Sequence, residues 1–139
     1  MTVVSATLRL STRGDADCLD ITSNVAGTVS ESGLRNGMAH LFVTGSTAGL
    51  TTIEFEPGCV HDLGRLFERI APRDGDYRHH ERWGDHNGHS HMRASLLGPQ
   101  LSIPFVDGEL TLGTWQQVIL VDFDDRPRDR TIAVQLIGD

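Results

Sequence analysis

The order of apolar and polar residues predicts strands along most of the chain. Residues 3–10 alternate in part, and the mostly apolar run 38–44 is typical of a strand buried on both faces. Similar patterns predict strands over 18–22, 50–56, 102–106, 109–123 with a break at Gly113, and 130–137. Between two of these strands, Asp107-Gly108 is a favoured two-residue hairpin turn.

Helical spacing of apolar residues is clearest after Pro57. An amphipathic helix is predicted from there to about Ala71, with an apolar stripe of Val60, Leu63, Leu66, Phe67 and Ile70. Two weaker patterns predict a helix from Ser23 or Asn24 to about Leu34 and a short helix over 91–97. The elements together predict one α+β domain over 1–139, with a mostly antiparallel sheet and two helices or slightly more.

Composition removes several classes of function. The formal net charge of −7 argues against a nucleic-acid surface, and no apolar run reaches membrane-spanning length. All twelve basic residues are arginine, so lysine chemistry such as a Schiff base is excluded. Cys18 and Cys59 are too few for a disulfide framework and are predicted to be small buried residues. Without a signal-peptide pattern at the N-terminus, a cytoplasmic protein is the default expectation.

Candidate chemistry is concentrated between Tyr77 and Arg93. Five of the seven histidines lie there, with Glu81 and Asp85 among them: His79, His80, His86, His89 and His91. Neutral imidazoles bind metals or carry protons, and carboxylates orient imidazoles. We interpret this loop-like segment as the functional site. The alternative is a solvated polar loop, and the spacing matches no zinc-finger or H-E-x-x-H pattern.

Local conformation decides which histidines meet. His89 and His91 would share a face of an extended segment but point far apart on a helix, where His86 and His89 would be neighbours. The preferred metal set is His79 and His91, with either His89 or a carboxylate such as Glu54. In the strand predicted over 50–56, Glu54 and Glu56 would share one face.

Two further segments contain candidate anion-binding groups. The turn 45–49 could surround an anion with backbone N–H groups and the hydroxyls of Ser46 and Thr47, although a plain hairpin turn is an alternative. Three arginines after the predicted strand 109–123 could bind phosphate or pair with nearby acids. These arginines are Arg126, Arg128 and Arg130, and the acids are Asp124, Asp125 and Asp129. Trp115 is predicted to be a packing residue, with a subunit contact as one place where it could pack.

Several sequence segments resemble the YjbQ-like proteins, also called secondary thiamine-phosphate synthase enzymes. The similarity covers nearly the whole chain. It is carried by residues 46–51 (STAGLT), 61–63 (HDL), 77–79 (YRH), 90–98 (SHMRASLLG), 103–105 (IPF) with Gly108, 112–116 (LGTWQ) and 126–130 (RPRDR).

This resemblance implies an α+β fold with a curved sheet core and two to three helices, assembled as a homotrimer. It also implies a histidine site near subunit contacts and a weak thiamine-phosphate synthase activity. In that reaction a pyrimidine pyrophosphate joins a thiazole phosphate and pyrophosphate is released. Two family histidines fall on His79 and His91, and a third falls on Gly45 and is missing. We hypothesise that His80, His86 or His89 replaces it.

We therefore expect a metal-binding enzyme that acts on a small phosphorylated molecule. The expected catalytic residues are His79, His91 and Glu54, and a divalent metal (Zn or Mg) would be held by His79, His89 and His91. The phosphorylated molecule would be bound by Ser46, Thr47, Arg93 and Arg128. The alternatives are a non-catalytic trimeric protein that binds metal or anions, and a metal-dependent hydrolase of phosphate esters.

Overall fold

Strand β7 (Gln117–Asp122) runs through the interior and is buried on both faces. In the computed structural model, which describes residues 1–139, Val118 and Leu120 face the larger of two hydrophobic cores. Ile119, Val121 and the following Phe123 face the smaller core, where Phe67 and Ala94 cover them. Because β7 touches both cores, residues at its end can connect parts of the molecule that are otherwise separate.

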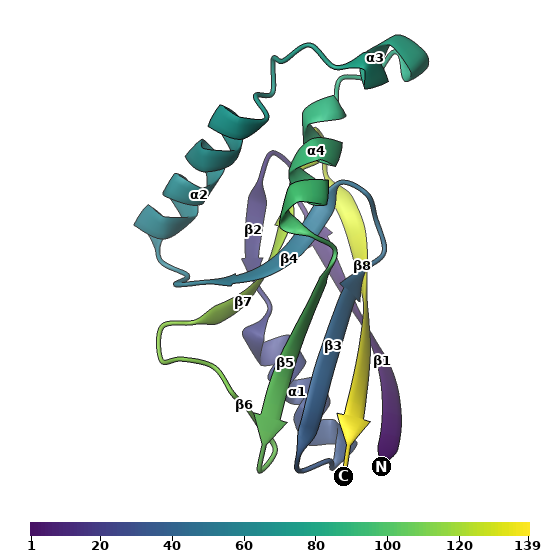
Figure 1. Cartoon of the computed structure of the whole chain (residues 1–139), viewed down its shortest axis with the longest axis vertical. Helices are drawn as coiled ribbons and strands as arrows, with labels where there is room; N and C mark the ends of the chain where they lie inside the picture. The colour runs from purple at the N-terminus through teal and green to yellow at the C-terminus, as the bar shows by residue number, and fades with distance from the viewer.

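Two antiparallel sheets make up the β structure (Figure 1). The smaller has the order β2 (Asp17–Asp20), β7 and β4 (Ala48–Ile53). The larger has the order β1 (Thr2–Thr12), β8 (Arg128–Gly138), β3 (Gly37–Val43), β5 (Gln100–Val106) and β6 (Glu109–Leu110). The predicted α+β fold with a curled, mostly antiparallel sheet is confirmed. The predicted hairpin turn joins β5 to β6, with positive φ at both Asp107 (54°) and Gly108 (83°).

Four helices accompany the sheets. They are α1 (Thr22–Ser32), α2 (Pro57–Ile70), α3 (Arg78–Trp83) and α4 (Gly88–Leu97). Three lie where helices were predicted, and α3 is an additional short helix inside the histidine segment. Figure 1 shows α2, α3 and α4 gathered at one end of the molecule and α1 behind the five-stranded sheet. No helix combines the length and the apolar character needed to cross a membrane.

Helix α1 begins earlier than predicted. Its first residue is Thr22, because the Asp20 carboxylate accepts hydrogen bonds from the Thr22 backbone N–H and hydroxyl. The predicted apolar positions Val25 and Val29 are fully buried in the larger core.

The two glutamates expected on a strand lie elsewhere. Strand β4 ends at Ile53, so the prediction that Glu54 and Glu56 share a strand face is wrong. Glu56 instead caps α2, where its carboxylate accepts the backbone N–H groups of Gly58 and Cys59. Pro57 at the first helical position and a capping carboxylate before it favour helix over a longer strand.

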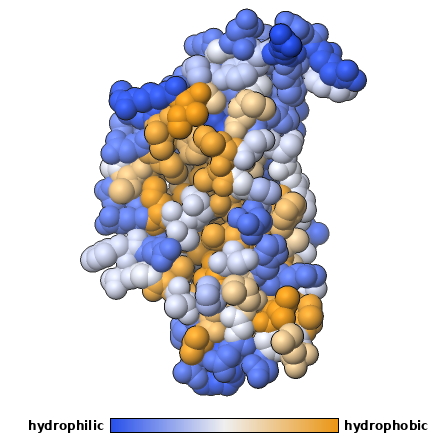
Figure 2. Space-filling model, viewed as in Figure 1, coloured by the Kyte–Doolittle hydropathy of each residue, from blue (hydrophilic) through white to orange (hydrophobic).

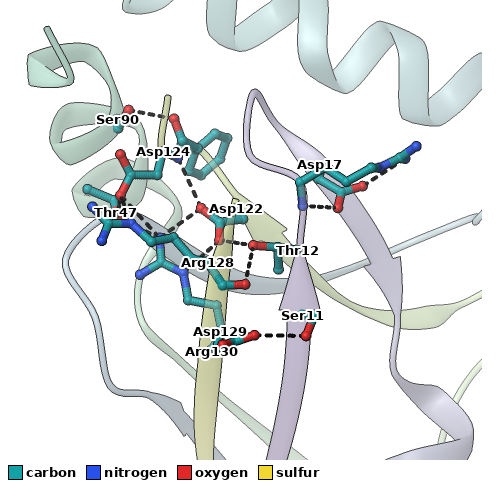
Figure 3. A network of polar contacts seen from close by, with 12 residues as sticks. Ser11, Thr12, Asp17, Thr47, Ser90, Asp122, Asp124, Arg128, Asp129 and Arg130 are labelled. Atoms are coloured by element: carbon teal, nitrogen blue, oxygen red, sulfur yellow. Dashed lines mark hydrogen bonds and ion pairs between the residues drawn. The ribbon is translucent and has the colours of Figure 1, made fainter. Parts of the chain in front are cut away.

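A buried ionic network lies at the end of β7, where the two sheets and α4 meet (Figure 3). Arg130 of β8 donates from Nε and Nη2 to the two oxygens of Asp122, at 2.6 and 2.7 Å. The same Nη2 donates to Thr47 Oγ1 at 2.6 Å, and the Thr12 hydroxyl donates to Asp122. Asp122 is completely buried, so its charge depends on this two-point pairing with the guanidinium.

Asp124 extends the network toward α4. Its carboxylate accepts hydrogen bonds from Asn87 Nδ2, Thr47 Oγ1 and Arg128 Nε. Asn87 is the residue that precedes α4. Burial alone would raise the pKa of Asp124, but hydrogen bonds from the Asp125 N–H, Asn87 and Arg128 outweigh it and lower that pKa well below its usual range. The charged form is therefore the one that holds the turn 45–47 and the start of α4 together.

Replacing Asp124→Asn should lower the free energy of unfolding at pH 7 by about 3–5 kcal/mol, because Arg128 and Arg130 lose a buried partner. A carboxyl with a lowered folded-state pKa stabilises the protein above its unfolded pKa of about 3.9 and loses this effect as pH falls through the folded value. The difference in the free energy of unfolding between wild type and variant, measured by urea unfolding, should thus be largest at pH 7 and become smaller in acid.

The matched control is Asp129→Asn, whose exposed carboxylate accepts one hydrogen bond from Ser11. This variant should cost less than about 1 kcal/mol. If the two variants lost the same free energy of unfolding at pH 7, the importance given to the buried network would be contradicted.

Candidate functional site

Helices α3 and α4 bring His79 and His91 together. Their ring centroids are 4.4 Å apart and the planes make an angle of 27°, so the imidazoles are stacked. Helix α3 ends at Trp83 and is capped by Gly84, whose left-handed conformation (φ 66°) reverses the chain direction. The backbone N–H of Gly88 then donates to His80 Nε2 at 3.0 Å, which fixes the start of α4 against α3. The short helix and its glycine end therefore produce the convergence.

The two stacked rings have different surroundings. Asp85 Oδ1 lies 3.2 Å from His79 Nδ1, but the two groups are not oriented to form a hydrogen bond. Burial lowers the pKa of His91, and the neighbouring charge of His79 lowers it further. The stacked rings offer two imidazoles at one position, and the one on His91 favours its neutral form, so the pair is suited to proton transfer and to donating an N–H to an anion.

A hollow of about 290 Å³ opens beside His91. Gly45 and Ser46, in the turn between β3 and β4, form one wall, and His91 and Ser95, one helical turn apart on α4, form another. Apolar side chains complete it, namely Phe42, Val43, Ala48, Ala94 and Pro99. A Cβ added at Gly45 would lie 2.8 Å from Arg130 Nη1. A histidine at this position would therefore require Arg130 to move.

His89 does not join the stacked pair. It lies on α4 two residues before His91, and helical geometry directs the two side chains to different sides of the helix. His89 lines a separate cavity with Arg93, and burial, then the charges of Arg93 and Arg73, lower its pKa. The structure thus does not bring the trio His79, His89 and His91 together. No group of three His, Cys, Asp or Glu side chains in the chain could hold a metal ion.

The remaining predicted site residues are distributed over three places. Glu54 is exposed in the connection from β4 to α2, which Figure 1 shows far from α3. Thr47 and Arg128 belong to the buried network, where both bind Asp124. Arg93 is buried and donates to the Ala71 carbonyl oxygen and to Glu68. Only Ser46, at the hollow, lies beside the histidine pair.

Sequence reasoning missed two residues that build this site. Asp122 and Asn87 connect β7 and α4 to Arg130 of β8, which the sequence analysis did consider. The signal available for Asp122 was its position at the end of an apolar strand followed by a turn rich in arginine. Nothing local to Asn87 distinguishes it from a solvated loop residue.

Comparisons with known proteins agree with this fold. The family model described as "UPF0047 protein YjbQ-like" matches residues 6–139. A UPF0047 protein of Methanothermobacter thermautotrophicus is 36% identical over 138 residues, covering 99% of this chain and 94% of the relative. The UPF0047 protein YugU of Bacillus subtilis is 31% identical over 133 residues, covering 95% and 98%.

Solved structures give the same result. A crystal structure of a YbjQ-like protein of unknown function from Sulfolobus solfataricus superposes with a TM-score of 0.93 at 31% identity, covering 99% of both chains. A hypothetical protein from Aeropyrum pernix gives a TM-score of 0.90 at 29% identity, covering 98% of this chain and 99% of the other. From the family match, these relatives and the shared fold, the chain belongs to the YjbQ/UPF0047 family, whose function is uncharacterised.

Proposed function

We propose that His79 and His91 form the binding and acid–base centre for a small phosphorylated molecule. We propose further that the chain has the weak thiamine-phosphate synthase activity that the sequence resemblance implies. The observation that supports this proposal is the stacking of the two rings at 4.4 Å beside the Ser46 hollow. Such a pair offers both a proton and an uncharged nitrogen at the same position.

The chemistry of the transfer suits this arrangement. The bond between the pyrimidine methylene carbon and the pyrophosphate oxygen breaks, and the thiazole nitrogen forms a new bond to that carbon. Negative charge grows on the leaving pyrophosphate, and hydrogen-bond donors already in place stabilise it. A protonated imidazole of the His79–His91 pair would donate to this oxygen, and the apolar wall of the hollow would accept an aromatic ring.

A second candidate function is non-catalytic binding of the same class of anion. It is favoured by Gly45, since the position where the resemblance implies a third histidine has no side chain. In that case the site would bind phosphorylated molecules through the same two imidazoles without forming product.

Replacing His79→Ala or His91→Ala should lower the synthase kcat/KM at least about 100-fold, because each removes one half of the proton-transferring pair. The measurement is formation of thiamine phosphate from the pyrimidine pyrophosphate and the thiazole phosphate. His40→Ala is the matched control, since His40 lies on β3 and is paired with Ser102 at 2.8 Å.

Two results would separate the alternatives. Wild-type rates in both the His79 and His91 variants would overturn the catalytic roles. A wild-type protein that binds both precursors but forms no product would support the binding function instead.

The divalent metal, Zn or Mg, stays a prediction. The donor set does not fit a complete metal site within one chain, because no three His, Cys, Asp or Glu side chains are grouped so that they could hold an ion. The imidazoles meet only in pairs, His79 on His91 and His80 beside His86. Elemental analysis of purified protein, with His91→Ala beside wild type, measures this directly.

We also propose that the protein self-associates as a homotrimer. The apolar stripe of α2 is only partly covered, since Leu66 and Ile70 are 49% and 54% exposed. Met92 and Leu96 of the neighbouring α4 are 51% and 60% exposed. Figure 2 shows apolar side chains collected over the upper half of this face. An exposed apolar area of this kind on an amphipathic helix favours contact with another copy.

Replacing Leu66→Glu together with Ile70→Glu should convert trimer to monomer, because each buried carboxylate would oppose association. Light scattering coupled to size-exclusion chromatography should give three chain masses for wild type and one for the variant. Val106→Glu, at an exposed apolar position on β5, is the control and should stay trimeric. A monomeric wild-type protein at micromolar concentration would contradict the proposal.

A further inference from the structure

A second cavity, of about 370 Å³, lies on the other side of α4 from His91, between α4 and α2. Its wall combines cationic side chains with two carboxylates and one buried imidazole. These groups are Arg65, Arg73, Arg93, Asp15, Glu68 and His89. A concentration of three guanidinium groups is unexpected in a chain with a formal net charge of −7.

Arg93 is the buried cation of this cavity. Its side chain is 6% exposed, and it donates from Nε to the Ala71 carbonyl oxygen and from Nη2 to Glu68. A guanidinium has five N–H donors, and Nη1 makes no hydrogen bond here. Glu68, the charge partner, is 54% exposed, and its carboxylate also accepts the backbone N–H of Arg73.

The other two arginines are accessible. Arg73 pairs with the half-exposed Asp15 at 2.5 Å, and Arg65 on α2 forms no ion pair. Each carboxylate at the cavity thus neutralises one arginine, and one arginine remains without a partner. An anion in the cavity would meet one unpaired guanidinium at once and could replace Glu68 or Asp15 at the others.

His89 contributes a different group. Its Nε2 lies 3.3 Å from Ser90 Oγ, and the Ser90 hydroxyl already donates its hydrogen to the Phe123 carbonyl oxygen. The serine can therefore only accept from Nε2–H, so the neutral ring carries its proton on Nε2. Its Nδ1 is then an acceptor, and this atom is buried and has no partner. Such an atom favours a ligand with a hydrogen-bond donor.

We propose that this cavity binds inorganic phosphate, which keeps at least one hydroxyl near neutral pH. The guanidinium groups of Arg65, Arg73 and Arg93 hold its charged oxygens, and His89 Nδ1 accepts from its hydroxyl. This site is separate from the His79–His91 pair and does not depend on the function proposed for that pair. On α4, the residues His89 and Arg93 face one cavity and His91 and Ser95 face the other.

Titration calorimetry with inorganic phosphate tests the site on the full chain. Arg65→Ala and Arg73→Ala should each weaken phosphate binding about tenfold, the effect of losing one charged hydrogen bond. Both residues are exposed, so these variants should fold. Arg69→Ala is the matched control, because Arg69 lies one helical turn after Arg65 and does not line the cavity. The phosphate affinity of the Arg69→Ala variant should differ from that of wild type by less than about twofold.

Sulfate provides a second comparison, because it carries no hydroxyl at neutral pH. Wild-type protein should bind phosphate about tenfold more tightly than sulfate, and His89→Leu should remove this preference. Equal affinity of wild type for the two anions would overturn the role given to His89.

The arginine cavity itself would be overturned by two results. One is that wild-type protein does not bind phosphate, or that the Arg65 and Arg69 variants lose phosphate affinity equally. The other is phosphate binding that His91→Ala abolishes while Arg65→Ala leaves it intact, which would assign the anion to the histidine pair. Loss of synthase activity in His79→Ala with phosphate binding unchanged would separate the two sites.

Discussion

The pairing of Arg130 with Asp122 is the interaction on which the arrangement of the site depends. Asp122 ends β7 in the smaller sheet and Arg130 lies on β8 in the larger one, so the pair joins the sheets at a completely buried point. Through Thr47 the same guanidinium holds the turn beside His91, and through Asp124 the network reaches Asn87 at the start of α4. Removing either Arg130 or Asp122 would leave the other with an unpaired buried charge, which costs several kcal/mol. The two sheets are therefore held at this point as long as both residues are present.

Helix α4 separates two chemically different cavities. Its residues at i and i+4 form two sets, one containing His91 and Ser95 and the other His89 and Arg93. The first set faces an apolar hollow and a stacked imidazole, and the second faces arginines and carboxylates. Because α4 is fixed at its start by Asn87 and packed through Ala94 against the smaller core, both cavities share one rigid support.

The parts of the fold that were predicted correctly follow from local patterns. The Asp107-Gly108 turn and the apolar stripe of α2 are each encoded within a few residues, and both were found where predicted. The strand over 50–56 was too long because alternation alone does not reveal that Glu56 is needed as the cap of α2. Helix α3 was missed because its six residues carry no apolar stripe.

The site was harder to predict because it depends on contacts between distant residues. The sequence indicated the histidine segment, and the stacking of His79 on His91 requires the Gly84 turn and the His80–Gly88 hydrogen bond. Helical geometry at α4 then separates His89 from His91, one of the two arrangements that sequence spacing left open. The sequence left open whether the arginines after β7 bind phosphate or pair with acids. In the structure Arg128 pairs with Asp124 and Arg130 with Asp122.

Hydrogen–deuterium exchange of Arg130→Gln against wild type tests the central role of the buried network most directly. The account predicts faster exchange in the turn 44–48 and in the first turn of α4, with the distant end of the β1–β8 pair near Thr2 and Gly138 unchanged. Unchanged exchange at both the turn and α4 would contradict it, because the guanidinium would then not be what holds these segments in place.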